Sequence, residues 1–271
     1  MSRSAVLVAA LVAALALAGT AWSVGPDLPA LQHATLGSGA ERYVVRTSAS
    51  GTIVRKLVRG QVAASATLAG GWGVQLATYR GDLAGLSGNG RTLVLSDNVN
   101  PDGHLRPASR FAVLDTRSLA LTRQIELRGD YGVDALSPRG DVLYLIHHVS
   151  RSDVTRYQVQ AYDLAAGRLL PGVIADKRQA GWVMAGSPVA RITSAGGRWV
   201  YTLYQQQDNY PFVHALDTAT RTAICVGLPL DWTKPWISSA HLALAGGTLR
   251  VEDGATTRAL VNTRTFAVST R

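Results

Sequence analysis

Short apolar strands and glycine-containing turns alternate along the chain from about residue 30 to its end. The clearest copies of this pattern are residues 83–95, 133–145 and 189–201, in which an apolar strand, a turn of small residues ending in Gly and a second apolar strand follow one another. Weaker copies occupy residues 32–45 and 241–251. A tight hairpin turn needs a positive φ, which a side chain penalises. The pattern therefore predicts five β-hairpins, with turn glycines at Gly39, Gly90, Gly140, Gly197 and Gly247.

A second signature follows four of these five hairpins. It is an apolar strand that ends in Asp115, Asp163, Asp217 or Asn262. The side-chain oxygen of such a residue caps a turn and leads into the next strand. A fourth strand is expected at residues 121–127, 169–175, 222–228 and 266–270. The first copy lacks this Asp, and its corresponding region is residues 51–58.

Four antiparallel strands per unit, repeated about every fifty residues, are typical of a β-propeller blade. We therefore predict an all-β fold, a β-propeller of about five four-stranded antiparallel blades. The degenerate first unit leaves the number of blades open, and a pair of β-sandwiches is the alternative. Leu136-Ser-Pro-Arg-Gly140, Leu143-Tyr-Leu145 and Asp163 resemble the bacterial YVTN and WD-repeat-like propellers, in which a Ser-Pro-Asp-Gly turn, a Leu-Tyr-Val strand and an Asp-Thr turn recur. That resemblance implies the fold and only weakly a function, because propellers carry many unrelated activities.

The first residues have the features of a secretory signal peptide. Arg3 precedes an unbroken apolar stretch from Ala5 to Ala18, and small residues follow as far as Ser23. We predict a signal peptide at 1–23 and a single propeller domain at 24–271, and so a secreted or cell-envelope location. An uncleaved membrane anchor at residues 5–22 is the alternative, since 18 residues are just enough to span a bilayer.

One face of the predicted propeller carries the longer loops and most of the tryptophans. If the strands of each blade are named a to d, the a–b and c–d connections are short, whereas the b–c and d–a connections on the other face are longer. Aromatic rings among charged residues suit a sugar, peptide or protein ligand, because flat rings stack on its apolar faces. Rings that fill gaps between blades are the alternative. The candidate ligand-binding residues are Trp72, Tyr131, Trp182, Trp232 and Trp236.

The five a-strands should line a central channel. Six residues before each turn glycine lie His33, Ala84, Asp134, Arg191 and His241, so these side chains are expected to form a ring around the axis. Asp134 and Arg191 belong to adjacent blades and could form an ion pair, with His241 completing a polar cluster. Such a cluster either stabilises a water-filled channel or acts as an acid–base or substrate-orienting site.

The net charge of the chain bears on the kinds of partner that it can bind. The 271 residues include 27 Lys and Arg against 18 Asp and Glu, a net charge of +9. A basic exported domain could contact anionic lipids or cell-wall polymers, although charges on a solvated blade edge explain the excess equally well. The densest basic cluster is Arg42, Arg46, Arg55, Lys56 and Arg59. No nucleic-acid recognition motif is present, and export also argues against nucleic acid as a partner.

Motifs for catalysis, metals and cofactors are missing from the sequence. It contains no Asp-x-Asp-x-Asp-Gly calcium loop, His-Glu-x-x-His zinc motif, Gly-x-Ser-x-Gly elbow or phosphate-binding glycine loop. We therefore expect no metal and no cofactor, and we interpret the lone Cys225 as a small buried residue. The leading hypothesis is an exported non-catalytic propeller that binds a protein partner or a cell-envelope glycan through its tryptophan-bearing face. The alternative is a hydrolase or lyase that acts on an envelope polysaccharide or peptide from that face.

Overall fold

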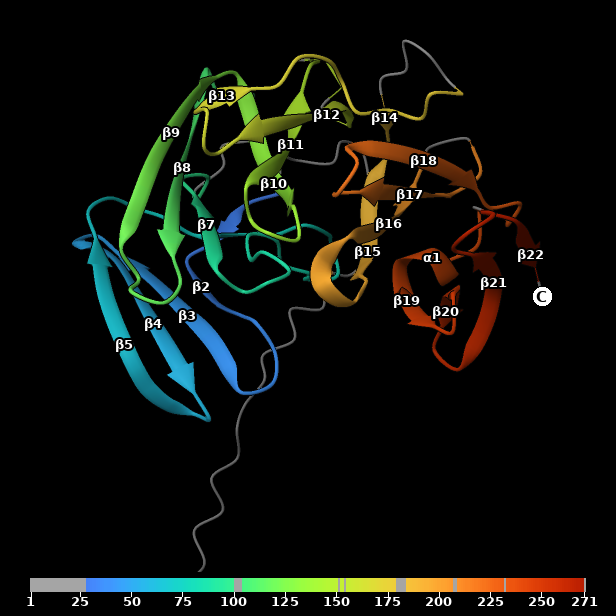
Figure 1. Cartoon of the computed structure of the whole chain (residues 1–271). Coiled ribbons are helices and arrows are strands. Elements are labelled where there is room, and N and C mark those ends of the chain that lie inside the picture. The colour runs from blue at the N-terminus through green and yellow to red at the C-terminus, as the bar shows by residue number, and fades with distance from the viewer. Residues whose placement is uncertain are drawn as a thin grey trace, which may run out of the picture.

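A computed structural model describes residues 28–270 except 100–103, 151, 154, 179–183, 207–208 and 232, so the predicted signal segment lies outside the described residues. The regular structure of the described chain is almost all β-strand, and most of its strands form five antiparallel sheets that follow the five repeats of the sequence (Figure 1). We number these sheets as blades 1 to 5. The prediction of an all-β propeller of about five blades is confirmed.

The strand order within every blade follows the chain. Blade 1 contains β2 (His33–Leu36), β3 (Glu41–Ser48), β4 (Gly51–Val58) and β5 (Gln61–Leu68), and blade 2 contains β7 (Thr92–Ser96), β8 (Ala108–Asp115) and β9 (Leu121–Arg128). Blade 3 contains β10 (Asp130–Leu136), β11 (Val142–His148), β12 (Arg156–Asp163) and β13 (Arg168–Leu169), and β14 (Met184–Ala185) also pairs with β12. Blade 4 contains β15 (Ser187–Thr193), β16 (Trp199–Gln205), β17 (Phe212–Asp217) and β18 (Thr222–Gly227). Blade 5 contains β19 (Ala240–Ala245), β20 (Thr248–Asp253), β21 (Thr256–Asn262) and β22 (Val268–Thr270).

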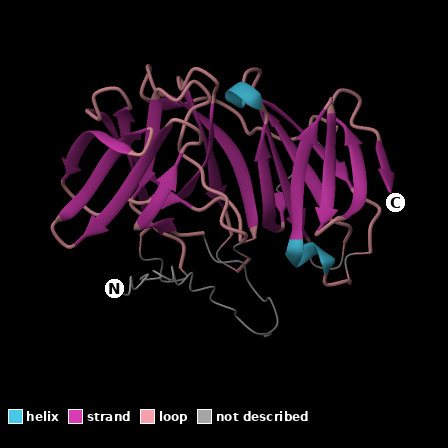
Figure 2. Ribbon diagram, turned by 90° about the horizontal axis from the view of Figure 1, so that it is seen from below, coloured by secondary structure: helices cyan, strands magenta, loops and turns pink. Residues whose placement is uncertain are grey.

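Three short elements complete the described structure. A two-stranded sheet joins β1 (Ala30–Leu31) to β6 (Val74–Gln75). A 3-10 turn, η1 (Ala195–Gly197), lies between β15 and β16, and a single helical turn, α1 (Trp236–Ser239), precedes β19. Figure 2 shows the two helical segments at opposite ends of the strands. We call the side with the a–b and c–d connections the turn face, and the side with the b–c and d–a connections the loop face.

The five blades form an open arc. In Figure 1 the first strands (β2, β10, β15 and β19) lie toward the middle, and the last strands (β5, β9, β18 and β22) lie at the rim. Blades 1 and 5 stand at the two ends of the arc, apart from each other. In blade 2, the segment before β7 takes the inner position, where Leu86 bridges Leu93.

Apolar side chains pack between successive blades. Tyr43 of blade 1 and Leu95 of blade 2 belong to one buried cluster, and Phe111 of blade 2 and Leu145 of blade 3 belong to the next. Further clusters join blades 3 and 4 and then blades 4 and 5. Buried and exposed positions alternate along β3, whose second face is open to solvent. β10 and β17 are buried along their whole length, because neighbouring blades cover both of their faces.

The predicted turn chemistry is present in the structure. All five turn glycines have positive φ, between 68° and 81°. The Oδ1 atoms of Asp115, Asp163, Asp217 and Asn262 each accept hydrogen bonds from the backbone N–H groups two and three residues further on. In three blades a threonine follows the capping Asp or Asn, and its hydroxyl donates to the carbonyl oxygen of the turn glycine. The pairs are Thr116 to Gly90, Thr218 to Gly197 and Thr263 to Gly247. The two sequence signatures therefore lock neighbouring turns together.

The fourth residue after each capping residue has a left-handed backbone. It is Gly167 in blade 3, with φ of 70°, but Arg221 in blade 4, with φ of 60°. A side chain at positive φ costs about 1 kcal/mol relative to glycine. We expect Arg221→Gly, at an exposed site, to raise the free energy of unfolding by about 0.5–1 kcal/mol in urea denaturation, and Gly167→Ala to lower it by a similar amount. Equal stability of Arg221→Gly and the parent chain would contradict the turn geometry.

Candidate functional site

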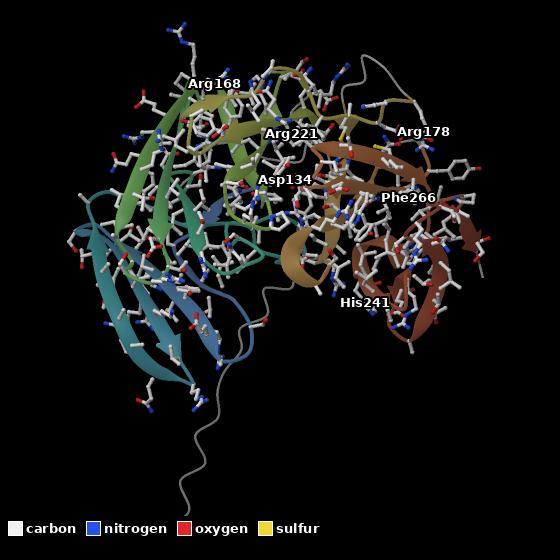
Figure 3. The ribbon with its side chains drawn as sticks, viewed as in Figure 1. Asp134, Arg168, Arg178, Arg221, His241 and Phe266 are labelled. Atoms are coloured by element: carbon white, nitrogen blue, oxygen red, sulfur yellow. The ribbon has the colours of Figure 1, made fainter. Side chains whose placement is uncertain are left out.

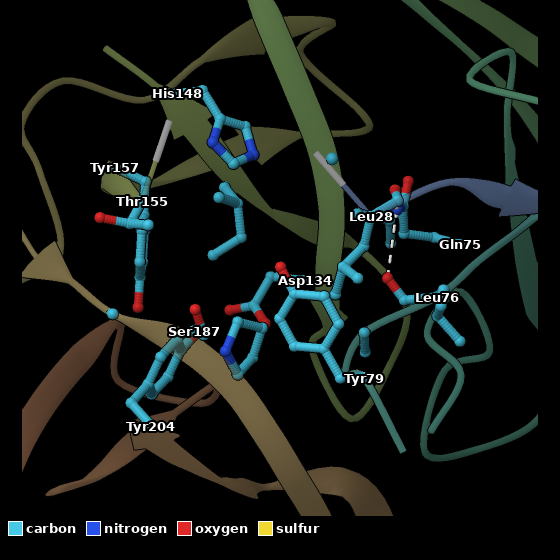
Figure 4. Close-up of a pocket in the computed structure, with 16 residues that line it drawn as sticks. Leu28, Gln75, Leu76, Tyr79, Asp134, His148, Thr155, Tyr157, Ser187 and Tyr204 are labelled. Carbon is cyan, nitrogen blue, oxygen red and sulfur yellow. Dashed lines mark hydrogen bonds between the residues drawn. The ribbon is translucent and has the colours of Figure 1, made fainter. Parts of the chain in front are cut away.

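A pocket of about 60 Å³ lies where blades 3 and 4 meet the segment before blade 2 (Figure 4). Its lining comes from strand ends next to the b–c and d–a loops: the start of β10, the ends of β11 and β16, and the starts of β12 and β15. The pocket therefore belongs to the loop face, which the sequence marked as the binding side. The lining residues with chemical interest are Gln75, Tyr79, Asp134, His148, Thr155, Tyr157, Ser187 and Tyr204.

Asp134 points into the middle of this pocket (Figure 4). It sits at a β-bulge in β10, because Val133 pairs with Leu145 and Ala135 pairs with Tyr144, which leaves Asp134 without a partner across the ladder. Bulges turn a side chain away from the regular alternation of a strand.

The ion pair between Asp134 and Arg191 that the sequence suggested is present. Arg191 donates through Nη2 to the Asp134 carboxylate and through Nη1 to its main-chain carbonyl oxygen, the latter at 2.7 Å. The two side chains are 8% and 6% exposed, so the pair is buried. The Arg191 main-chain N–H also donates to Asp82 Oδ2 at 2.8 Å, which ties β15 to the inner segment of blade 2.

Two buried polar atoms of the pocket lining lack a well-formed hydrogen bond among the described residues. Oε1 of Gln75 has no partner, and the hydroxyl of Tyr157 interacts only weakly with the hydroxyl of Tyr204; both side chains are almost fully buried. Gln75 Nε2, by contrast, donates to the carbonyl oxygens of Leu28 and Leu76 (Figure 4). A buried polar atom without a partner costs stability, so it suggests that a bound group supplies the missing partner.

Burial also keeps the hydroxyls of Tyr157 and Tyr204 protonated. It raises the pKa of Tyr157 well above its ordinary value, and the neighbouring hydroxyl of Tyr204 and the charge of Asp134 act in the same direction. Burial and the charge of Asp134 likewise raise the pKa of Tyr204. The two rings stack with centroids 5.6 Å apart. Both hydroxyls are therefore neutral donors at physiological pH.

The candidate aromatic residues occupy interior positions where the structure describes them. Trp72, Tyr131 and Trp236 are 6%, 4% and 7% exposed. Trp72 Nε1 donates to the Ala69 carbonyl at 2.7 Å, and Trp236 Nε1 donates to the Asp231 carbonyl at 2.9 Å. These three rings fill gaps in the fold, which is the alternative given for them in the sequence analysis. They do not offer a flat exposed face to a ligand. Trp182 and Trp232 lie outside the described residues.

The expected ring of channel residues is present only in part. Ala84, Asp134 and Arg191 line one cavity near the axis. His33 is exposed on blade 1, and His241 pairs with Glu252 of its own blade, Nε2 to Oε2 at 3.1 Å. Figure 3 shows His241 on the blade at the end of the arc, away from Asp134. The polar cluster therefore consists of Asp134 and Arg191, because the open arc places His33 and His241 at its two ends.

The cavity that contains Ala84 has a volume of about 340 Å³ and lies on the turn-face side of the Asp134–Arg191 pair. At the edge of this cavity, blades 2 and 4 lie so close that only glycine fits. A Cβ on Gly88 of blade 2 would lie 2.1 Å from the Gly196 carbonyl oxygen of blade 4. Tyr79 N–H also donates to the Pro188 carbonyl at 3.0 Å. The inner segment of blade 2 therefore reaches blade 4 and fills the middle of the arc.

A line of buried groups runs from the centre toward the rim between blades 3 and 4. The ladder of blade 4 places Arg191, Thr202, His214 and Cys225 side by side. Cys225 is buried as predicted, and burial raises the pKa of its thiol to about 12, so it is no nucleophile at neutral pH. Its main-chain N–H donates to Asp176 at 2.9 Å.

Sequence reasoning missed Tyr157, Tyr204 and Gln75. Tyr157 and Tyr204 occur in apolar strands, where an aromatic residue usually indicates core. The signal that could have found them is position, since both lie at strand ends that adjoin the b–c loop of their blade. Within the described part of the chain, no cluster of three or more potential metal ligands is present, and no helix is long and apolar enough to cross a bilayer.

Comparison with known proteins gives distant structural similarity alone. No protein-family model matches the chain, and no curated protein matches it. Among solved structures, apo AztD from Citrobacter koseri is 12% identical over 88% of this chain and 58% of its own, with a TM-score of 0.45. TolB from Acinetobacter baumannii is 11% identical over 83% of this chain and 49% of its own, with a TM-score of 0.39. The Swd1 β-propeller domain from Myceliophteria thermophila is 14% identical over 84% of this chain and 66% of its own, with a TM-score of 0.42.

The chain has a β-propeller fold. Its own sheets establish this, and the three solved structures are similar to it in fold alone. It spans less than two thirds of the AztD and TolB chains that it resembles. The narrower assignment to YVTN or WD-repeat-like propellers stays a prediction.

Proposed function

We propose that this chain is an exported, non-catalytic β-propeller that binds a cell-envelope glycan in the loop-face pocket around Asp134. The observation that carries the proposal is a pair of incompletely satisfied buried atoms in its lining. The amide oxygen of Gln75 has no partner among the described residues, and the phenol hydroxyl of Tyr157 has no well-formed hydrogen bond. The neutral phenol can donate and the amide oxygen can only accept. A sugar hydroxyl donates and accepts at once, so a hydroxyl-rich ligand satisfies both atoms.

The walls of the pocket fit the same ligand class. The rings of Tyr79, Tyr157 and Tyr204 lie among aliphatic side chains, and Thr155 and Ser187 add hydroxyl groups at the margin. Carbohydrate sites combine aromatic faces with a few placed polar groups. The volume of about 60 Å³ admits only part of one sugar residue, so the site would hold the end of a chain and not a long glycan.

Charge in the pocket favours binding over hydrolysis. Asp134 is the only carboxylate among the described lining residues, and Arg191 holds it in a buried ion pair. Glycoside hydrolysis by the usual mechanisms requires two carboxyl groups across the scissile bond. A glycoside hydrolase that used this pocket by those mechanisms would therefore need a second acidic group from elsewhere.

The Tyr157→Phe variant tests the proposal. We expect it to bind an envelope saccharide about 3–10-fold more weakly in isothermal titration calorimetry, because one hydrogen bond to the ligand is lost. Its melting temperature should be nearly unchanged, because the hydroxyl makes no well-formed hydrogen bond in the free protein. The ligand is first selected by screening purified protein against peptidoglycan fragments, teichoic acids and capsular oligosaccharides.

Tyr210→Phe is the matched control. Tyr210 is 57% exposed on the loop face and lies outside the pocket. The variant loses one phenol oxygen, as Tyr157→Phe does, but its affinity for the saccharide should be unchanged. Equal weakening by both variants, or no saccharide binding at all, would count against the pocket. Release of reducing ends or shortened products during the titration would instead support the hydrolase alternative.

A further inference from the structure

The outermost strand of blade 1 differs from the outermost strands of the other blades. β9 carries exposed charges at Glu126 and Arg128. β13 and β22 are only two and three residues long, and β18 is covered by the segment at Asp176, which bridges Ala223 in parallel. β5 is eight residues long, contains no charged residue and is exposed over most of its length.

An unprotected edge of this kind is unusual. An edge strand presents unpaired backbone N–H and C=O groups that can pair with another chain, and proteins commonly block it with charge, proline, shortness or a covering segment. β5, with the sequence Gln-Val-Ala-Ala-Ser-Ala-Thr-Leu, has none of these devices. Val62, 58% exposed, adds an apolar contact near its start.

The solvent-exposed face of blade 1, here called its outward face, favours an acidic partner at this edge. The side chains of Arg42, Arg46 and Arg55 are exposed on the face of the sheet opposite buried Tyr43 and Val54. Exposed His33 lies beside Arg46 in the ladder. The carboxylate of this blade, Glu41, belongs to the other face, where it pairs with Lys56 at 3.1 Å. Among the described residues, the outward face of blade 1 therefore carries positive charge and no carboxylate.

We propose that β5 binds an extended acidic segment of a partner protein, which adds to blade 1 as a fifth strand. Backbone hydrogen bonds along β5 would provide the pairing, and carboxylates at alternate positions of the segment would lie on the same face as Arg55, two strands away at about 10 Å, within the attraction of this basic face. Pairing of β5 with β5 of a second copy is disfavoured, because it would join two basic faces. This surface is separate from the loop-face pocket and does not depend on the proposed glycan site.

A synthetic peptide tests this surface. The probe is a fluorescein-labelled octapeptide with Glu and Val at alternate positions, measured by fluorescence anisotropy against the full chain. We expect saturable binding, and at least tenfold weaker binding after N-methylation of every second residue, because N-methyl groups remove backbone donors without changing charge. A Lys–Val octapeptide should bind at least tenfold more weakly, and Arg55→Gln should weaken the Glu–Val peptide several-fold.

Two proline variants locate the pairing on the protein. Ala64 and Ser65 are consecutive in β5, so the N–H of one points to β4 and that of the other points to the open edge. We expect the two variants, Ala64→Pro and Ser65→Pro, to differ: one should keep the melting temperature and lose the peptide, and the other should be destabilised. The N-methylated peptide decides the question even if neither variant folds.

Three results would overturn the proposal. The first is equal binding of the methylated and unmethylated peptides, which would indicate charge attraction alone. The second is no peptide binding together with binding to vesicles of phosphatidylglycerol and phosphatidylcholine, which would assign the basic face to a lipid surface. The third is a dimer in analytical ultracentrifugation that the proline variants abolish, which would assign β5 to self-pairing.

Discussion

Asp134→Ala should lower the free energy of unfolding by about 3–5 kcal/mol, because it leaves the Arg191 guanidinium buried without its counter-ion. Both side chains are more than nine-tenths buried, and Arg191 Nη2 loses its carboxylate acceptor. Arg191 keeps its bond to the main-chain carbonyl of residue 134, which cannot neutralise the charge. Urea denaturation of the purified chain measures the loss.

Two further variants separate burial from charge. Asp231→Ala removes an exposed carboxylate that pairs with Lys234 and accepts hydrogen bonds from Thr233, and it should change stability far less than Asp134→Ala does. The double variant Asp134→Leu/Arg191→Met replaces both charges with apolar side chains and should recover most of the lost stability. A cost below about 1 kcal/mol for Asp134→Ala would mean that the pair is open to solvent and is not buried.

The parts of the fold that the sequence predicted depend on local chemistry. Turn glycines at five equivalent positions need positive φ, and Asp115, Asp217 and Asn262 cap their own turns within three residues. Such features repeat wherever the same few residues repeat, so they predict blade boundaries without knowledge of the neighbouring blades. The Asp134–Arg191 pair could be predicted for a similar reason, since equivalent positions of adjacent repeats lie at equivalent heights.

The parts that could not be predicted depend on how the blades pack together. A tryptophan in a loop can be exposed or folded back, and Trp72 and Trp236 are both folded back onto carbonyl oxygens of their own loops. The opening between blades 1 and 5 separates His33 and His241 from the central pair, although the spacing to their turn glycines is the same. The inner segment of blade 2 crosses to blade 4 because glycines allow close contact at Gly88 and Gly196. That contact joins residues about a hundred positions apart, and no local pattern reports it.

Stability should fall when the pH is lowered from 7 to 4, largely because of His214. Burial lowers the pKa of His214 to about 4, an effect that Arg191 reinforces and that Asp134 and Asp176 oppose. The same imidazole titrates near 6.5 in the unfolded chain. Below pH 6.5 the unfolded state therefore binds a proton that the folded state does not, and the free energy of unfolding decreases until the pH reaches about 4. The difference of about 2.5 pKa units corresponds to about 3 kcal/mol.

Urea denaturation at pH 7, 6, 5 and 4 measures this dependence, and His214→Leu should remove most of it. Leucine suits the site because the imidazole Nε2 is buried without a partner among the described residues, and Nδ1 meets only the Cys225 thiol at 3.7 Å. His147, whose pKa is also lowered by burial, should leave a smaller dependence of the same sign in the variant. His33→Leu changes an exposed imidazole at the end of the arc and is the matched control, which should keep the pH dependence of the parent chain. A parent chain that is equally stable at pH 7 and pH 4 would show that His214 accepts a proton in the folded state, and therefore that the space between blades 3 and 4 is open to water.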